Sequence, residues 1–203
     1  MRLHRSPAGL AMVGLLLAGC VGEATPPSNT PGPSSTIPAS TSAAESAPAS
    51  HEPIPSDALG AFSCDLPVVE DATVARALIT DVRVGTHTDY DRVVFEFADG
   101  LPEVTLDRAT PPFTHDASGL PVEVDGSSFL RLTMRGGTKQ TLDNTSSYDG
   151  PTDFDPEFPT LVHLVEGGDF EAQSTWYLGL TREACVRVLQ LTDAPRLVID
   201  VEH

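Results

Sequence analysis

The sequence is poor in basic residues. It contains 12 Lys and Arg against 29 Asp and Glu, which gives a formal net charge of −17 at pH 7. Nucleic-acid binding requires a basic patch, and a negative field of this strength repels DNA, RNA and anionic lipid headgroups. Wall polyanions such as teichoic acids are poor partners for the same reason. Neutral glycans, cationic groups and other proteins remain as candidate partners.

The sequence also contains no apolar run long enough to cross a membrane. The apolar stretch Leu10–Leu16 falls well short of the ~20 residues needed to span a bilayer. Arg2 and Arg5 precede this stretch, and small residues follow it. A charged start, a short apolar region and a small-residue cleavage site are, in that order, the parts of a secretory signal peptide. We therefore predict that residues 1–19 are a signal peptide.

A cysteine follows this signal directly. The segment Leu17-Ala18-Gly19-Cys20 resembles the lipobox of bacterial lipoproteins, which implies that Cys20 receives a diacylglycerol thioether and further acylation after cleavage. Two or three acyl chains hold a protein stably on a membrane. The predicted location is therefore the outer face of the cell membrane, with a lipid anchor at Cys20. An ordinary secretory signal and an uncleaved membrane anchor are the alternatives.

Large apolar side chains are scarce in residues 21–60. Pro, Ser, Ala and Thr fill 27 of these 40 positions. Such a segment buries too little apolar area to offset the entropy of ordering it, so we predict that it is disordered. As a random coil it would reach roughly 35 Å. We therefore interpret residues 20–60 as the lipidated cysteine and a tether that holds a domain away from the lipid surface.

Cysteine is the next scarce residue, with three in the chain. If Cys20 carries lipid, Cys64 and Cys185 remain as an even pair in an oxidising compartment, where such pairs form disulfides. We predict a disulfide between them that fastens the start of the domain to a late strand. The alternative, a catalytic thiol, needs a base nearby, and the sequence shows no such pairing.

Residues 61–203 have the composition of one folded domain. They hold 25 Asp and Glu against 10 Lys and Arg. A segment of about 140 residues is long enough to form a single hydrophobic core. Apolar and polar residues alternate with period 2 in short runs separated by Gly, Pro and Asp, which predicts an all-β sandwich or barrel. The predicted strands cover residues 78–84, 93–97, 103–106, 121–124, 129–134, 161–165, 176–180, 185–189 and 197–201. Residues 155–162 are the best helical candidate, and residues 110–112 and 148–159 are predicted surface loops.

Motifs of enzymes and metal sites are missing. The sequence has no Gly-x-Ser-x-Gly elbow, Walker loop, His-Glu-x-x-His or Cys-x-x-Cys. His87, His115 and His163 are widely spaced, so we expect no metal site made by them. The acidic stretch 149–157 lacks the EF-hand spacing and is interpreted as a solvated loop, with cation binding as the alternative. We therefore expect a protein that is not an enzyme and uses no cofactor.

The two ends of the domain and one segment between them carry a recognisable pattern. The pattern comprises Ile79-Thr80-Asp81-Val82-Arg83-Val84-Gly85, His87, Tyr90-Asp91-Arg92-Val93-Val94-Phe95-Glu96-Phe97, Gly168-Asp169-Phe170-Glu171, Trp176, Gly179-Leu180 and Asp193-Ala194-Pro195-Arg196-Leu197-Val198-Ile199-Asp200-Val201. These residues resemble the AMIN domain, the localisation module of cell-wall amidases and pilus secretins. They are most similar to AMIN-like lipoproteins of Gram-positive bacteria with high-G+C genomes. The resemblance implies a β-sandwich of two small sheets that binds envelope components.

Two segments of this pattern share one plan, an Arg followed by apolar residues and an acid. On a strand, Arg92 lies on the same face as Glu96, and Arg196 lies on the same face as Asp200. One interpretation is structural salt bridges, within a strand or between neighbouring strands. The other is a ligand surface on which the arginines bind a peptidoglycan carboxylate.

A tryptophan and a tyrosine alternate in the same way. Trp176 shares a face with Leu178 and Leu180, so we predict that it lies in the core and that Tyr177 is exposed. Tyr177, Arg92 and Arg196 are therefore the candidate ligand surface. In the alternative, Tyr177 packs beneath a loop and both arginines pair with acids.

These patterns together predict a membrane-anchored lipoprotein whose AMIN-like domain binds peptidoglycan or a wall protein. One alternative is a structural subunit of an envelope complex. A small wall-active hydrolase without a recognisable motif is the other. The membrane is a partner through the lipid anchor in each case.

Overall fold

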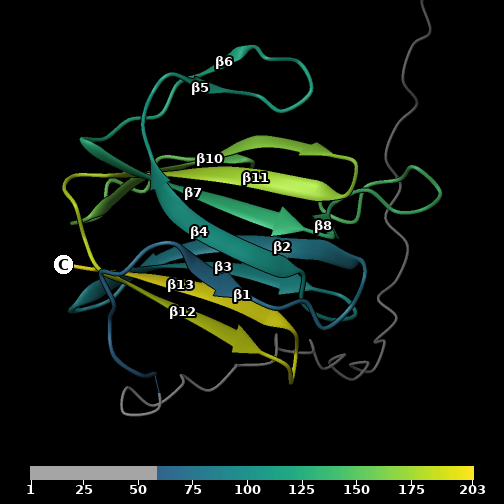
Figure 1. Ribbon diagram of the computed structural model, residues 1–203, viewed down its shortest axis with the longest axis horizontal. Coiled ribbons are helices and arrows are strands. Elements are labelled where there is room, and N and C mark those ends of the chain that lie inside the picture. The colour runs from purple at the N-terminus through teal and green to yellow at the C-terminus, as the bar shows by residue number, and fades with distance from the viewer. Residues whose placement is uncertain (1–58) are drawn as a thin grey trace, which may run out of the picture. The chain divides into compact units, whose positions relative to one another are not determined.

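The computed structural model describes residues 59–203, which form a β-sandwich of two main sheets and a small hairpin (Figure 1). The six-stranded sheet has the order β1 (Val68–Glu70), β4 (Glu103–Ala109), β7 (Ser128–Arg135), β11 (Gln173–Leu180), β10 (Leu161–Phe170) and β9 (Asp153–Phe154). The five-stranded sheet has the order β12 (Val186–Leu191), β13 (Arg196–Glu202), β3 (Tyr90–Phe97), β2 (Ala77–Thr86) and β8 (Gly137–Thr138). Strands β5 (Phe113–Thr114) and β6 (Pro121–Val122) form the hairpin. Pairing is antiparallel except between β2 and β8.

The core lies between the two sheets and follows from the alternation in the sequence. Inward-facing residues of β3, β7, β11 and β13 are almost completely buried. Trp176 of β11 meets Phe95 of β3 edge to face, with ring centroids 5.2 Å apart. The Trp176 indole N–H donates to the Ser174 hydroxyl at 2.9 Å, so its burial leaves no polar atom unsatisfied. The predicted core position of Trp176 is confirmed.

The all-β prediction is confirmed as well, and the helical candidate is wrong. Residues 59–203 contain no helix, and none of the described segments is a helix that could cross a membrane. Residues 155–160 run irregularly from β9 into β10, and the apolar Phe158 packs against the core. The sequence did not predict the short strands β1, β5, β8 and β9, because two or three residues carry no detectable period. The predicted loop over 148–159 contains β9 and the buried Tyr148.

A buried carboxylate joins the two sheets at one end of the sandwich. Asp91 of β3 is fully buried and accepts hydrogen bonds from the backbone amides of Thr160 and Leu161, both at 2.8 Å. The Thr86 hydroxyl and the ring of His203 also contact this carboxylate, at 2.8 and 2.9 Å. Burial alone would raise the pKa of Asp91, but these hydrogen bonds together outweigh burial and lower it. The charged carboxylate therefore fixes the start of β10 against β3.

The predicted disulfide between Cys64 and Cys185 is present. It links positions 121 residues apart and fastens the segment before β1 to the residue preceding β12. The predictions for residues 1–58, which include the signal peptide, Cys20 and nearly all of the tether, lie outside the described residues.

Residues 59–64, here called the strap, lie against the five-stranded sheet. Leu59 is 2% exposed, and the carbonyl of Gly60 accepts a hydrogen bond from Arg187 at 3.1 Å. Ser63 exchanges two backbone hydrogen bonds of 2.8 Å with Val186 at the start of β12. Leu59 and Gly60, which the sequence assigned to the tether, thus belong to the folded part.

Candidate binding face

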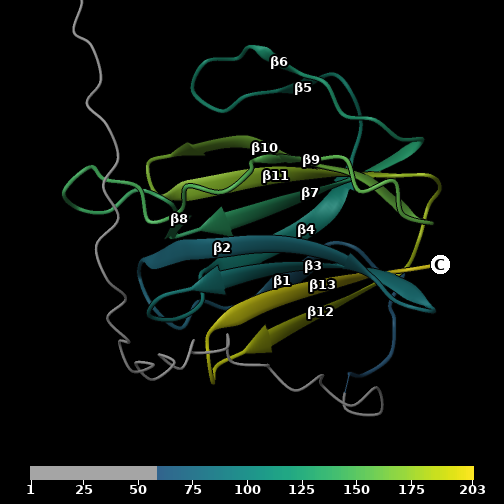
Figure 2. The same ribbon diagram turned by 180° about the vertical axis from the view of Figure 1, so that it is seen from behind.

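Residues 110–124, here called the arm, cover part of the outer face of the six-stranded sheet. Figures 1 and 2 both show β5 and β6 on the side of this sheet that faces away from the five-stranded sheet. Phe113 and Val122 of the arm form a second apolar cluster with Tyr177 and Val165 of the sheet. The ring of Phe113 lies 4.8 Å from that of Tyr177 and 5.0 Å from that of Phe129, measured between centroids.

The arm overturns the predicted exposure of Tyr177. Alternation correctly directs Tyr177 away from the main core, but the side chain is buried beneath the arm, with 7% of the residue exposed. Its hydroxyl donates to the carbonyl of Thr114 at 3.3 Å. Burial, reinforced by the charge of Asp116, raises the pKa of Tyr177, so the phenol stays protonated. A strand pattern shows which way a side chain points and not what covers it.

Two glycines allow the arm and the segment after it to dock. Gly168 of β10 has a φ of 146°, and a Cβ there would lie 2.9 Å from the Cβ of Asp116. Asp116 donates its backbone N–H to the carbonyl of Gly167 at 2.7 Å. At Gly179 of β11 a Cβ would overlap the carbonyl oxygen of Asp125. Both glycines provide room for close backbone approach, which other residues would block.

A polar pocket lies beside the arm. It has a volume of about 370 Å³, and its walls include Thr114 of the arm with Arg131 and Tyr177 of the sheet. Arg131 donates to the Asp107 carboxylate across the β4–β7 pair at 2.8 Å. That hydrogen bond, partly opposed by burial, raises the pKa of Arg131. The second carboxylate oxygen of Asp107 is buried without a hydrogen-bond partner.

The strip of sheet next to this pocket is polar and is not covered by the apolar cluster under the arm. Thr105 of β4 pairs with Thr133 of β7, one row along from the Asp107–Arg131 pair, and both threonines are half-buried. Hydroxyl, carboxylate and guanidinium groups thus lie on the same face of the sheet. Such a surface offers donors and acceptors to a ligand rich in hydroxyl and amide groups.

Arg92 and Arg196 lie on the opposite side of the sandwich from Tyr177, so the three predicted residues do not form one patch. Strand register places Arg92 opposite Asp200 and Arg196 opposite Glu96. Arg92 donates to both oxygens of the Asp200 carboxylate, at 2.6 and 2.9 Å. The pairing of Arg92 is therefore between strands, as the structural interpretation allowed. Arg196 donates through Nε to the carbonyl of Ala194 at 3.2 Å.

A second arginine completes the cluster around Asp200. Arg187 of β12 donates to the same carboxylate at 2.9 and 2.6 Å. Its guanidinium lies 4.4 Å from the ring centroid of Phe62 in the strap and 5.0 Å from that of Tyr90. Burial would lower the pKa of Arg92, but hydrogen bonding to Asp200 raises it. Two arginines thus share one fully buried carboxylate beneath aromatic rings.

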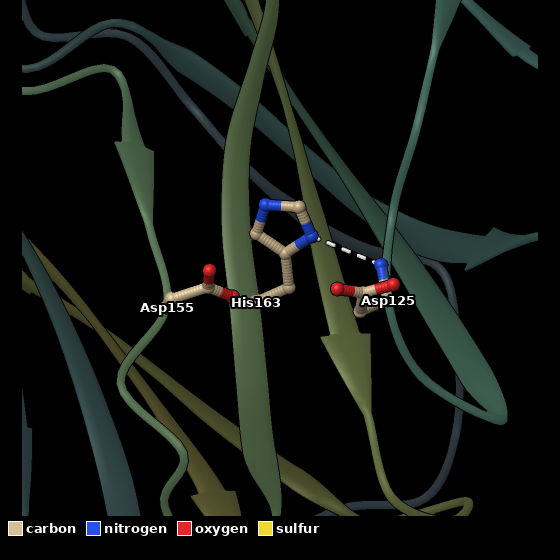
Figure 3. A group of neighbouring side chains, drawn as sticks. All are labelled: Asp125, Asp155 and His163. Atoms are coloured by element: carbon tan, nitrogen blue, oxygen red, sulfur yellow. Dashed lines mark hydrogen bonds between the residues drawn. The ribbon is translucent and has the colours of Figure 1, made fainter.

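His87, His115 and His163 were considered as metal ligands, and no group of potential metal ligands among residues 59–203 contains two of them. His87 stacks on Tyr90 with centroids 4.5 Å apart, and burial, followed by the charge of Arg92, lowers the pKa of His87. His115 belongs to the arm and lines a second pocket of about 310 Å³. His163 of β10 is buried, and two residues that the sequence did not connect with it, Asp125 and Asp155, flank its ring (Figure 3). Asp155 belongs to the acidic stretch 149–157.

Comparison with protein families identifies the domain. A family model described as the AMIN-like domain matches residues 77–203. The chain belongs to the AMIN-like family. No curated protein and no solved structure matches it. Membership indicates an envelope- or peptidoglycan-associated role, and AMIN domains are non-catalytic binding or targeting modules, in keeping with the expected absence of enzymatic activity.

Residues that carried the AMIN-like resemblance hold the arm and its surroundings in place. Gly168 and Gly179 receive the arm and the segment behind it. Asp169, next to Gly168, accepts from the Thr138 hydroxyl at 2.7 Å and from the amide of Lys139 at 2.6 Å. The sequence did not indicate Asp107 and Arg131. Alternation directed Arg131 away from the core, whereas Asp107 lay outside the predicted strand 103–106, and only the strand order brings the two together beside Tyr177.

Proposed function

We propose that the protein is a lipid-anchored envelope protein whose AMIN-like domain binds peptidoglycan glycan on the outer face of the six-stranded sheet. The observation that carries this proposal is the AMIN-like family match over 77–203. The polar pocket and the strip beside the arm support the choice of face. The Arg–Asp200 cluster on the opposite face is already internally paired.

The charge of the chain is compatible with this ligand. Neutral N-acetylated sugars are not repelled by a domain of strongly negative charge, whereas polyanions are. Sugar hydroxyl and amide groups match the donors and acceptors around Asp107, Arg131 and Thr133. Arg131 also offers a guanidinium to a stem-peptide carboxylate, a pairing that is often bidentate.

Binding is tested by co-sedimentation of the full chain with purified sacculi. Arg131→Gln should reduce the bound fraction several-fold with little change in melting temperature, since an exposed ion pair contributes about 0–1 kcal/mol to stability. Arg83→Gln is the matched control, because Arg83 is equally exposed and ion-paired but lies on the other face, and it should bind like wild type. Equal binding by the two variants would contradict the proposed face, and absence of wild-type binding would contradict the proposed ligand.

The anchor at Cys20 is tested separately by fractionation. The signal segment and the cysteine that follows it support lipidation. Cys20→Ala should release the protein from membranes or leave an unprocessed precursor. A variant that fractionates and migrates like wild type would contradict the anchor.

A protein partner is the second candidate, and the edge of the five-stranded sheet favours it. Val186 uses its outward backbone groups to pair with Ser63. Alternate residues of a strand direct these groups to the same side, so those of Val188 and Gln190 face outward beyond the strap. An extended peptide could add to β12 there. Binding to sacculi that persists only while wall proteins remain attached would favour this candidate.

A further inference from the structure

A group of potential metal ligands lies at the end of the arm. Asp125 follows β6, Asp155 follows β9, and His163 belongs to β10 (Figure 3). One ligand atom from each residue lies within 4.8 Å of the other two. Around a tetrahedral ion, bonds of about 2.0–2.2 Å place ligand atoms about 3.3–3.6 Å apart. Both aspartates are exposed, so small side-chain movements suffice to bring three ligands onto one ion.

The ring of His163 is oriented as in a metal site. Its Nε2 lies 2.9 Å from a carboxylate oxygen of Asp153, and its Nδ1 lies 2.9 Å from the backbone nitrogen of Asp125. The amide can only donate, so Nδ1 carries the lone pair and Nε2 carries the proton that Asp153 accepts. Metal-bound histidines characteristically donate their other N–H to a carboxylate in this way. Asp153 thus directs a lone pair toward the side of the ring where Asp125 lies.

We propose that Asp125, Asp155 and His163 bind a divalent transition-metal ion of the Zn²⁺ type. Two carboxylates neutralise the charge of such an ion, and an imidazole nitrogen favours Zn²⁺ and its neighbours over Ca²⁺ and Mg²⁺. The ion replaces the Asp125 amide as the partner of Nδ1. The negative field of the domain raises the local cation concentration. This site departs from the expectation of no metal, because sequence spacing gave no sign that the three residues converge.

Metal binding would connect three segments that hold the arm. The ion would join β10 to the chain after β9 and to the segment between β6 and β7. A ligand that binds only the folded state stabilises it in proportion to the logarithm of its concentration over its dissociation constant. Added Zn²⁺ should therefore raise the melting temperature and slow amide exchange in residues 121–127.

Calorimetric titration of the full chain with ZnCl₂ tests the site, together with thermal unfolding. Asp155→Asn and Asp125→Asn should each weaken binding at least tenfold and reduce the Zn²⁺-dependent rise in melting temperature. Asp149→Asn removes an exposed acid of the same stretch from outside the group and should behave like wild type. Asp153→Asn should weaken binding by a smaller factor, because Asp153 orients His163 without touching the ion. These variants keep His163, whose loss could unfold the segment.

Nitrogen NMR of the His163 ring supplies an independent measurement. Zn²⁺ should shift the Nδ1 resonance while Nε2 remains protonated. Absence of saturable Zn²⁺ binding up to millimolar concentrations would overturn the proposal. So would equal affinity in wild type, Asp125→Asn and Asp155→Asn, or equal affinity for Ca²⁺. The outcome is independent of sacculus binding, which Arg131→Gln tests.

Discussion

The two outer faces of the sandwich are covered in different ways. On the five-stranded sheet, Arg92 and Arg187 converge on the buried Asp200, and the strap lies over them. On the six-stranded sheet, an apolar cluster holds the arm over Tyr177, and the neighbouring polar strip is not covered by it. The Arg–Asp200 cluster of the first face is mostly buried, whereas the Arg131–Asp107 pair of the second face is exposed. Similar strand patterns thus lead to a structural face and to a candidate binding face.

Removal of the disulfide should lower the stability of the domain more than any other change to either face, because the disulfide holds the strap against the five-stranded sheet. A crosslink between residues 121 apart stabilises a fold by about 4–5 kcal/mol in the chain-entropy model, and often by less. Cys64→Ser with Cys185→Ser should lower the free energy of unfolding by up to this amount in a urea titration. The double variant should also expose Phe62 and Arg187 to solvent, which amide exchange in residues 59–64 would report. Unchanged exchange there would show that the strap holds without the disulfide.

Neutralisation of Asp200 should cause the second-largest loss of stability. Asp200→Asn leaves two partly buried arginines without a countercharge, and breaking a buried ion pair in this way costs about 3–5 kcal/mol. The matched variant Asp107→Asn breaks an exposed pair on the other face and should cost about 0–1 kcal/mol. Urea denaturation of the two variants measures the contrast directly. Equal losses would mean that the two faces do not differ as described.

Truncation beneath the arm should have an intermediate effect. Tyr177→Ala removes the ring that contacts Phe113 and should cost about 3 kcal/mol, as for other large buried rings. Tyr177→Phe keeps the ring and loses only a long hydrogen bond to Thr114, so it should cost about 0.5–1 kcal/mol. Thermal unfolding gives both values. Faster amide exchange in the arm of Tyr177→Ala alone would show that the apolar cluster holds it.

Acid should lower stability by protonating Asp91, which lies at the junction between the two sheets and on neither outer face. The pKa of Asp91 is lowered below the ordinary value of 3.8, so its contribution to stability is complete above that pH. The contribution is lost as the pH falls through the folded-state value. Asp91→Asn should therefore unfold more easily at neutral pH and lose less stability between pH 4 and pH 2. Urea titrations across this range measure the slope, and identical slopes would contradict the role of Asp91.

Local sequence patterns predicted which main strands form and which of their residues face the core. The contacts on the two outer faces depend instead on how distant strands pair. Alternation alone placed Trp176 in the core, and the even pair of cysteines left after Cys20 predicted the disulfide. Register determines that Arg92 meets Asp200, and register depends on strand order, which no local pattern reveals. The burial of Tyr177 depends on the two-residue strands of the arm. The approach of Asp125 and Asp155 to His163 similarly requires three segments to fold together.

The disulfide has a mechanical consequence in the proposed arrangement, in which the domain is held between a lipid anchor at Cys20 and the wall. Tension that arrives along the chain before Leu59 acts first on the strap, whose hydrogen bonds can be peeled one at a time. Peeling stops at Cys64, where the covalent link carries the load to Cys185 and into the base of β12. The backbone after Cys64 also continues into β1, so from this residue the load divides between β1 and β12. Tension on the strap is therefore shared by the two sheets, because β1 belongs to the six-stranded sheet and β12 to the five-stranded sheet.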